Sequence, residues 1–404
     1  MFVGMIEMDK TKIKTLIKQV RGVSYKPDDL HNELNGDSVI LLRANNIDDG
    51  KINFDDVVYV DKSKVSDEQY LRKGDILICA SSGSKNLVGK AASVDFDREC
   101  TFGAFCKAVR PNEDVVDYLG VYFQSPVYRR KISEVAIGAN INNIRNEHID
   151  ELEVPLFSRD EQQEIVKKIQ LVLDIISKRK DEISSLDDLI RARFVELFGD
   201  PVHNTKGWNT DTCKNLTSKI GSGATPKGGR ESYGTEGISL IRSMNVYNKR
   251  FEYKDLAYIT DEQADKLSNV TIEENDVLLN ITGASVARCC VVPKDLIPAR
   301  VNQHVAIVRC KDRLLPEFLC NMFTENSYQR LLWSIATSGG ATREAITKQQ
   351  IEDLVLIVPP IELQEQFAAF VHQVDKSKFD TMTFAPIYAI INLYLHAHFY
   401  QGRR

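Results

Sequence analysis

The sequence lacks the marks of membrane, secreted and metal-binding proteins. It has no window of 18 apolar residues and no basic N-terminal flank followed by an apolar segment, so neither a membrane span nor a secretory signal is predicted. Its eight cysteines form no C-x-x-C pair and no Cys/His cluster with zinc-ligand spacing. We therefore expect a cytoplasmic protein with no membrane partner, no bound metal, and reduced, mostly buried thiols.

An excess of positive charge is also absent. The chain has 57 acidic residues against 52 Lys and Arg, and its formal net charge is −5. Phosphate contacts need clustered Lys and Arg, so this balance by itself disfavours a nucleic-acid partner. Local basic clusters do occur between Lys10 and Lys26 and at Lys227 and Arg230. They fit either DNA contacts or an ordinary solvated surface.

No catalytic motif is complete. Residues 83–91 resemble a phosphate-binding loop, but five residues instead of four separate the glycines, and Ala91 stands where Mg²⁺ binding needs Ser or Thr. Residues 221–229 are rich in glycine without the order of a dinucleotide-binding loop. There is no Asn-Pro-Pro-aromatic run of the kind that amino-methyltransferases use, and no Asp, Glu and Lys spacing that indicates a nuclease. We therefore predict a non-catalytic protein.

The main positive feature is an internal duplication. The run LLRANN at 41–46 returns as LIRSMN at 240–245, GDIL at 74–77 returns as NDVL, and IDEL at 149–152 returns as IEDL. After the last of these, each copy continues with a proline and then Glu-Gln. A period of about 200 residues is far longer than a solenoid repeat and predicts two whole domains, each with its own core.

A long helix is predicted between the two copies. Ser158 and Glu161 form a capping box, and Gly199 followed by Pro201 ends the helix, which places it at residues 158–198. Its apolar residues keep the spacing of a coiled-coil seam that spans roughly 50 Å and is expected to need a partner helix. The seam consists of Ile165, Ile169, Val172, Ile176, Ile183, Leu186, Ile190 and Leu197, with Arg179 and Arg193 at two of its positions.

The second copy starts a similar helix after Pro359-Pro360, but its heptad pattern stops near Phe379, and Pro386 prevents a continuous helix. We therefore predict a short distal helix at 360–380 and an atypical tail at 381–404. A short partner would leave part of the central seam uncovered. One hypothesis is that the 3′ end of the reading frame has been altered, which would weaken the docking of a partner subunit.

The remaining pattern predicts an α+β fold. Short alternating runs separated by Gly, Asn and Ser indicate a curled mixed β-sheet in each copy, with a helical piece at 316–332. The predicted domains are 1–157 and 199–359, separated by the central helix and followed by the distal helix.

Repeated polar residues are the candidates for DNA contacts. Arg43 and Arg242 lie at equivalent strand ends beside Asn46 and Asn245, and both residue types can bond bidentately to base edges. Each Arg could equally pair with a neighbouring carboxylate, and the hydroxyl-rich loops could be plain structural turns. The full candidate set is Arg21, Tyr25, Lys26, Arg43, Asn46, Ser81, Ser82, Lys85, Lys90, Thr225, Lys227, Arg230, Arg242, Asn245, Thr282, Ser285, Asn302, Gln303 and His304.

Taken together, these motifs resemble the specificity subunits of type I restriction-modification systems. The resemblance covers about residues 15 to 379. It rests on the duplication, on GATP at 223–226, TGAS at 282–285 and NQHV at 302–305, and on the two proline-to-Glu-Gln exits into helices.

The resemblance implies two target-recognition domains, each recognising one half of a bipartite site in double-stranded DNA. It further implies two antiparallel spacer helices that dock two methyltransferase subunits, with motor-nuclease subunits joining for restriction. S-adenosylmethionine, ATP and Mg²⁺ would then be bound by the partners and not by this chain. Given the length of the seam, the half-sites would lie about one to one and a half DNA turns apart.

Two other functions stay open. The chain could be a helical scaffold whose two β-rich domains bind protein, which the net charge of −5 favours. It could also be the separated recognition half of a fused restriction enzyme, although no catalytic segment precedes residue 15.

Overall fold

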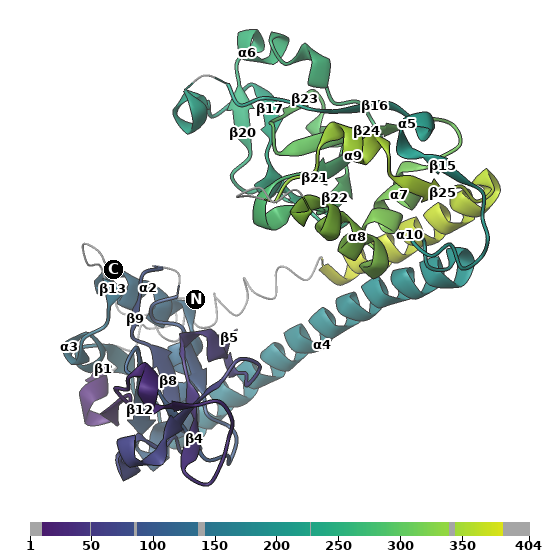
Figure 1. Cartoon of the computed structure of the whole chain (residues 1–404). Coiled ribbons are helices and arrows are strands. Elements are labelled where there is room, and N and C mark those ends of the chain that lie inside the picture. Colours follow the sequence, from purple (N-terminus) through teal and green to yellow (C-terminus); the bar gives the residue numbers. More distant parts are fainter. Residues whose placement is uncertain are drawn as a thin grey trace. The chain divides into compact units, whose positions relative to one another are not determined.

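The computed structural model describes residues 10–48, 50–84, 87–135, 142–226, 228–338 and 344–382. They form two compact units that divide between Lys180 and Asp181, within the long helix α4 (Arg159–Phe198). Figure 1 shows the elements of each unit. The predicted tail at 381–404 lies almost entirely outside the described residues, and the predicted domain bounds stay a prediction.

Helix α4 begins and ends where its sequence signals predict. The backbone N–H of Ser158 donates to Glu161 Oε2 at 3.0 Å, and its hydroxyl donates to the same oxygen at 2.6 Å. At the other end, Gly199 adopts φ +74° and donates its N–H to Val195 O, which is the geometry of a helix C-cap. No helix among the described ranges combines the length and apolar character that a membrane span requires.

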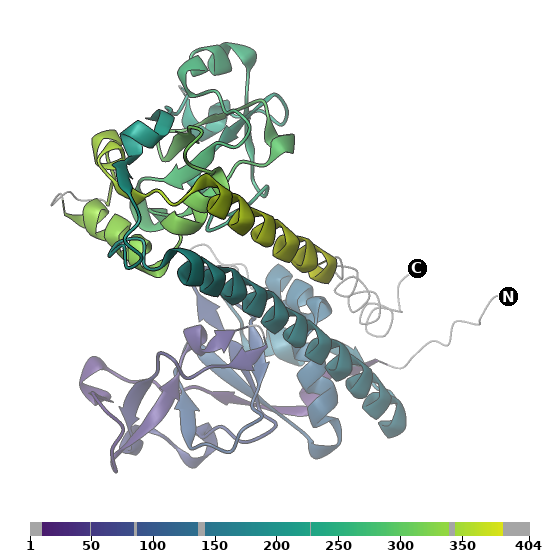
Figure 2. The same cartoon turned by 90° about the vertical axis from the view of Figure 1, so that its right-hand side faces the viewer.

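Helix α10 (Ile361–Met382) begins beside the C-terminal part of α4 and runs antiparallel to it (Figure 2). Phe194 and Phe198 of α4 pack against Phe367 with ring centroids 5.5 Å apart in both cases. Farther along, Lys378 donates to Asp187 at 2.6 Å. The distal helix predicted for 360–380 is therefore present and packs against the central helix.

The seam of α4 is not left uncovered, which corrects the expectation from the sequence. Ile165 and Ile169 are buried in the core of the first unit, whereas Ile190 is buried in the core of the second. Phe194 occupies the buried position that a strict heptad assigns to Arg193. A straight helix drifts from a 3.5-residue repeat, which is why Phe194 and not Arg193 lies on the buried side in the C-terminal half of α4.

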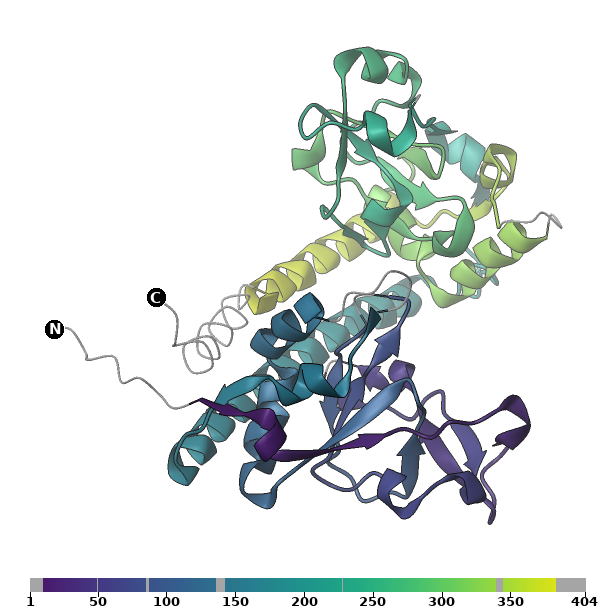
Figure 3. The ribbon, with the colours of Figure 1, turned by 90° about the vertical axis from the view of Figure 1, so that its left-hand side faces the viewer.

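The first domain contains two four-stranded sheets (Figure 3). One is antiparallel in the order β10-β8-β12-β2, with β2 (Ile17–Arg21), β8 (Ile76–Cys79), β10 (Ala91–Ser93) and β12 (Cys106–Pro111). The other has the order β11-β4-β7-β3, with β4 and β11 parallel; its strands are β3 (Leu30–His31), β4 (Ser38–Leu42), β7 (Val58–Asp61) and β11 (Cys100–Phe102). Three further pairs are β1–β14 (Lys10–Lys12, Glu153–Pro155), β5–β6 (Ile47–Asp48, Lys51–Ile52) and β9–β13 (Ser81–Ser82, Asn142–Asn143).

Helices close one side of the first domain's core. They are α1 (Val116–Gln124), α2 (Pro126–Val135) and α3 (Asn146–Asp150). Tyr118, Tyr122, Phe123 and Tyr128 from α1 and α2 are at most 1% exposed and share a core with Ile165 and Ile169 of α4. This packing fixes the N-terminal half of α4 on the first domain.

The second domain repeats this topology, except that its mixed sheet has three strands and, within the described residues, lacks a counterpart of β3. Its antiparallel sheet has the order β16-β24-β21-β22, and its other sheet the order β20-β17-β23 with β17 and β23 parallel. The strands are β16 (Thr217–Ser222), β17 (Ile238–Ile241), β20 (Ala257–Ile259), β21 (Val277–Asn280), β22 (Cys289–Val291), β23 (Ala299–Val301) and β24 (Val305–Cys310), with the pairs β15–β25 (Thr210–Thr212, Val355–Ile357) and β18–β19 (Val246–Tyr247, Arg250–Phe251).

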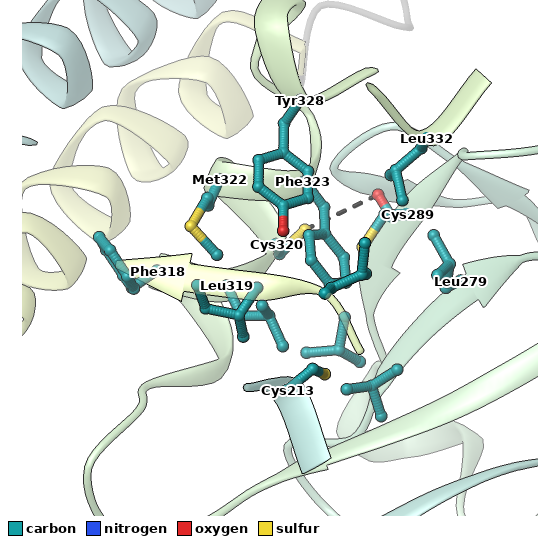
Figure 4. Packing of buried hydrophobic residues seen from close by; sticks show 14 of the residues in the cluster. Cys213, Leu279, Cys289, Phe318, Leu319, Cys320, Met322, Phe323, Tyr328 and Leu332 are labelled. Atoms are coloured by element: carbon teal, nitrogen blue, oxygen red, sulfur yellow. Dashed lines mark hydrogen bonds between the residues drawn. The ribbon is translucent and has the colours of Figure 1, made fainter. Parts of the chain in front are cut away.

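The core of the second domain gathers aromatic and sulfur side chains from its helices and sheet (Figure 4). The helices are α5 (Cys213–Leu216), α6 (Asp261–Asp265), α7 (Pro316–Phe323), α8 (Asn326–Thr337) and α9 (Lys348–Glu352). The helical piece predicted at 316–332 is thus two helices, which corrects the prediction. Thr324 bonds back to Cys320 O at 2.8 Å, and the Gln329 side chain donates to Phe323 O at 2.6 Å, so side chains replace the backbone bonds at this break.

A buried ion pair anchors each copy at the same place. Arg110 donates two hydrogen bonds to Asp75, both at 2.8 Å, and Arg309 donates to Asp276 at 2.7 and 2.9 Å. The residue before each Asp, Gly74 or Asn275, has positive φ, which both residue types tolerate. The duplication seen in the sequence is therefore also a duplication of side-chain contacts.

Candidate nucleic-acid interface

The first domain has a cleft of about 650 Å³ at one edge of its sheets. Strands β2 and β8 both run antiparallel to β12, so their C-terminal ends lie at the same edge. The parallel strands β4 and β11 also end together. The loops that follow these strands line the cleft with Tyr25, Arg43, Asn45, Ser81, Ser82 and Phe105.

A glycine allows two of these loops to approach each other closely. A Cβ at Gly22 would lie 2.2 Å from Gly103 O, and a Cβ at the equivalent Gly223 would lie 1.8 Å from Val301 O. Gly22 directly follows β2, and Gly223 directly follows the equivalent strand β16. Only glycine fits there, so the loop after this strand is held against the loop that carries Phe105, or His304 in the second copy.

Arg43 lies in the cleft but is already paired. Its Nη2 is 2.9 Å from Asp56 Oδ2 and donates to Asp56 O at 3.2 Å. Asn45 also donates to Asp56 Oδ2, at 2.9 Å. The equivalent Arg242 donates to the backbone carbonyl of Asp255. The structure therefore shows Arg43 paired with a neighbouring carboxylate, which is one of the two roles that the sequence left open.

Asn46 and Asn245 do not belong to the accessible surface, which corrects their assignment as base-contacting residues. Both are 0% exposed. The side-chain oxygen Oδ1 of Asn46 accepts from Arg43 N at 2.8 Å, and its Nδ2 donates to Asp56 O at 3.1 Å. Asn245 makes the same bond to Arg242 N and donates to Glu252 O at 2.8 Å. Their amides hold the loop because the loop backbone would otherwise be buried without partners.

In the second domain, four of the predicted residues form a connected group. Thr282 Oγ1 lies 2.6 Å from His304 Nδ1, and His304 Nε2 lies 3.1 Å from Gln303 Nε2. Thr225 donates to Gln303 Oε1. Exposed Thr225 and Gln303 thus meet half-buried Thr282 and His304, and the group offers hydrogen-bonding atoms at the edge that carries the cleft in the first domain.

Asn302 is only 4% exposed, and its side chain accepts from His304 N at 3.0 Å, so it shapes the turn and does not offer a contact; this is a second correction. Ser285 is half-buried next to this group. Arg21 is exposed at the end of β2, and Lys26 is exposed in the loop that follows this strand.

Lys90 lines a different cavity, which it shares with Ile169 and Lys180 of α4, and it pairs with Asp48 at 3.5 Å. It is therefore not brought to the cleft of Arg43. Lys85 and Lys227 lie outside the described residues, as does the side chain of Arg230.

Phe105 was not predicted from the sequence. It is 70% exposed and lines the same cleft as Arg43, Ser81 and Ser82. The signal that could have found it is a large aromatic residue after Gly103-Ala104, at the position that aligns with His304 of the second copy.

Of the cysteines, Cys106 lines the cleft of the first domain, where it is only 1% exposed. All eight are free, and seven are buried, which confirms the predicted burial. Burial raises the pKa of Cys100 and of Cys213 to about 12, so both stay protonated thiols at neutral pH. Over the described ranges, no three His, Cys, Asp or Glu side chains are grouped so that they could hold a metal ion.

Two duplicated mixed-sheet domains, each with polar loops at the strand ends and joined through a long helix, define a tandem recognition protein. The chain belongs to the family of the type I restriction modification DNA specificity domain, whose model matches residues 8–185 and 206–387. This confirms the resemblance seen in the sequence.

Two curated relatives carry the name specificity subunit. The subunit of the type I restriction enzyme StySPI from Salmonella potsdam is 29% identical over 377 residues, which cover 89% of this chain and 80% of the relative. That of EcoKI from Escherichia coli (strain K12) is 26% identical over 379 residues, with the same coverages.

Two solved structures have the same fold. A chain from a study of complex assembly and conformational transition of the type I R-M system aligns with a TM-score of 0.53 at 16% identity, covering 98% of both chains. The S subunit from M. genitalium aligns with a TM-score of 0.52 at 14% identity, covering 98% of this chain and 96% of that one. The predicted α+β architecture with two recognition domains is therefore confirmed.

Proposed function

We propose that this chain is the sequence-specific DNA recognition subunit of a type I restriction-modification complex, in which each domain recognises one half of a bipartite target. The observation that carries the proposal is that both copies present loops at the same edge of the same scaffold but fill them with different polar side chains. Tyr25 and Ser81 of the first copy stand where the second has Pro226 and Thr282. One scaffold with two sets of contacts suits two different half-sites.

The reaction chemistry would belong to the partners. Hydroxyl, amide, imidazole and guanidinium groups at the candidate surfaces can recognise base edges and phosphates. In this proposal, S-adenosylmethionine is bound by two methyltransferase subunits, and ATP and Mg²⁺ by motor-nuclease subunits.

The charge balance supports a shared DNA interface. Asp56 neutralises Arg43 within the first cleft, and the whole chain carries a net charge of −5. Phosphate binding by this chain alone should therefore be weak, because affinity for the DNA backbone depends on the number of phosphates that cations neutralise. Partner subunits would supply part of the phosphate contact, and this chain would supply specificity.

The spacer helix offers a surface for those partners. On α4, Leu171 is 61% exposed, Leu189 is 48% exposed and Ile175 is 38% exposed. Exposed apolar residues along one helix favour protein binding. The same residues favour the alternative function, a helical scaffold whose β-rich domains bind protein and not DNA.

A domain exchange tests the proposal. Residues 15–157 are replaced by the equivalent domain of a relative with a different target, the chain is expressed with its methyltransferase partner, and methylated adenines are mapped across the genome. We expect one half of the methylated sequence to change and the other to stay. The reciprocal exchange of residues 206–357 is the matched control and should change only the other half.

If both halves or neither changed, independent recognition by the two domains would be wrong. The scaffold alternative is tested with the purified complex and duplex DNA. It predicts no sequence preference and no loss of affinity when the salt concentration rises, whereas DNA recognition predicts both.

A further inference from the structure

We propose that Phe105 recognises thymine in the half-site of the first domain, through apolar contact between its ring and the C5-methyl group. This inference rests on the proposed function and adds to it the identity of one base and one specificity-determining residue.

The first observation is the exposure of the ring. At 70%, Phe105 is the most exposed of the large apolar side chains among the described residues. Leaving a Phe side chain in water forgoes the stabilisation that burial would give. A ring held out in a cleft of about 650 Å³ is therefore a feature of the loop that folding alone does not explain.

The second observation is that the backbone around the ring is fixed. Phe105 O accepts from Ala80 N at 2.9 Å and from Ser81 N at 3.0 Å. On either side, Cys106 N donates to Gly103 O at 2.8 Å, and Ala104 N donates to Val23 O at 2.9 Å. The loop is thus hydrogen-bonded to the segments that follow β8 and β2. Its backbone is already ordered, so contact with a ligand costs little further conformational entropy.

The chemistry of the surroundings selects the occupant. Arg43, Ser81 and Ser82 bring hydrogen-bonding groups to the same cleft, whose other lining residues include the small apolar Ala44 and Ala104. In the major groove, every base pair presents hydrogen-bonding atoms, and the thymine C5-methyl is the apolar group among them. A cleft that offers an exposed apolar ring beside hydrogen-bonding side chains fits an A·T pair, with thymine facing Phe105.

The second copy shows that this position is free to vary. His304 stands there, and its carbonyl accepts from Ile281 N at 3.0 Å, as the Phe105 carbonyl accepts from Ala80 N. The backbone contact is kept while an apolar ring is replaced by a hydrogen-bonding one. This is the pattern expected of a position that distinguishes two half-sites on one scaffold.

The test measures binding of the complex with its methyltransferase to duplexes in which each thymine of the target is replaced, one at a time, by uracil. Uracil lacks only the methyl group. We expect the unaltered protein to lose about fourfold in affinity at one thymine of the first domain's half-site, the value for one buried methyl group. Phe105→Ala should show no loss at that position and unchanged losses elsewhere.

Leu34→Ala is the matched control, because Leu34 is also an exposed apolar residue of the first domain, at 52%, and does not line the cleft. It should keep the uracil effect. Circular dichroism checks that both variants fold.

Three outcomes would overturn the inference: no thymine in this half-site responds to uracil, the response persists in Phe105→Ala, or an abasic site opposite the ring increases affinity, as for an intercalating wedge. Failure of the proposed function looks different, since the unaltered complex would then not distinguish target from non-target duplexes.

Discussion

In their recognition loops, the two domains differ at exposed positions and agree at buried asparagines. Asn46 and Asn245 are both fully buried, and the side chain of each accepts from the backbone N–H of the Arg three residues earlier. Next to them, Asn45 bonds to Asp56, whereas the equivalent Met244 is 42% exposed. Phe105 and His304 also occupy equivalent positions with different side chains, an apolar ring in the first copy and a hydrogen-bonding ring in the second. Internal comparison thus separates residues that hold the loops from residues that the loops present.

The comparison also concerns what each half of α4 packs against. In the second unit, Phe194 and Phe198 of α4 both pack against Phe318 of α7 and against Phe367 of α10. In the first unit, α4 contributes the aliphatic Ile165 and Ile169 to a core that they share with Tyr118. The predictions below test this asymmetry and the shared scaffold.

The largest effect is expected for Phe194→Ala. Phe194 is 0% exposed and contacts Phe318 and Phe367 at 5.6 and 5.5 Å. Its removal should lower the free energy of unfolding of the second unit by about 3 to 5 kcal/mol through lost burial and the cavity left behind. Both tryptophans, Trp208 and Trp333, lie in this unit, so urea unfolding followed by fluorescence reports on it selectively.

The control for this change is Val195→Ala, because Val195 is the next residue of α4 and is 45% exposed. It should shift the fluorescence transition little. If Phe194→Ala and Val195→Ala shifted it equally, α4 would not belong to the second core.

The next effect should be the same in both domains. Arg110→Ala and Arg309→Ala would leave Asp75 and Asp276 without their partners, and these acids are only 1% and 0% exposed. Loss of one member of a buried pair costs roughly 3 to 5 kcal/mol; here we expect the low end because the Arg side chains are partly exposed. Thermal unfolding of each variant measures the loss, and a large difference between the two would show that the scaffolds are not equivalent.

A smaller, functional effect is expected for Arg43→Ala and Arg242→Ala. Each should weaken specific binding by roughly 1 to 3 kcal/mol and relax one half-site if the side chain reaches a base edge. Asp56→Asn separates a base contact from a structural role. It removes the carboxylate partner of Arg43 and keeps the bond to the Asp56 backbone carbonyl, so a base-contacting Arg43 should keep its specificity. An Asp56→Asn variant that lost as much binding as Arg43→Ala would assign Arg43 to holding the loop. If Arg43→Ala weakened binding equally on all DNA sequences, Arg43 would contact a phosphate and not a base.

Much of the fold could be predicted because it follows from periodic or local signals. The capping box at Ser158, the C-cap at Gly199 and the 200-residue repeat each depend on a few residues whose physics is local. What covers the seam could not be predicted, because an apolar stripe on α4 does not say whether a helix or a domain core packs on it.

The candidate site was predicted only in part, for a related reason. Sequence shows that Asn46 can form hydrogen bonds, but not that its partners are the backbone groups of its own loop. It also gives no reason to expect Phe105 on the surface, since a Phe between Ala104 and Cys106 is more often buried. Thr225, Thr282, Gln303 and His304 are brought together by three strands that are distant in sequence.

The smallest effect concerns a buried acid present in one copy alone. Glu325 is 6% exposed at the start of α8, where the first domain has the neutral Ser125. Burial raises the pKa of Glu325 above its ordinary value of 4.5, although Lys249 and Arg191 partly offset this. A carboxyl whose folded pKa is raised destabilises the fold as pH rises from the unfolded pKa to the folded one.

Glu325→Gln should therefore stabilise the second unit at neutral pH and should have little effect below pH 4.5, where the carboxyl is protonated in both states. Tryptophan fluorescence in urea at several pH values measures the difference from the unaltered chain. A variant that is less stable at pH 7 would mean that the attraction of Lys249 and Arg191 outweighs the burial of the charge. The acid would then be a favourable anchor of the second domain, and the difference from Ser125 would be a gain in stability specific to this copy.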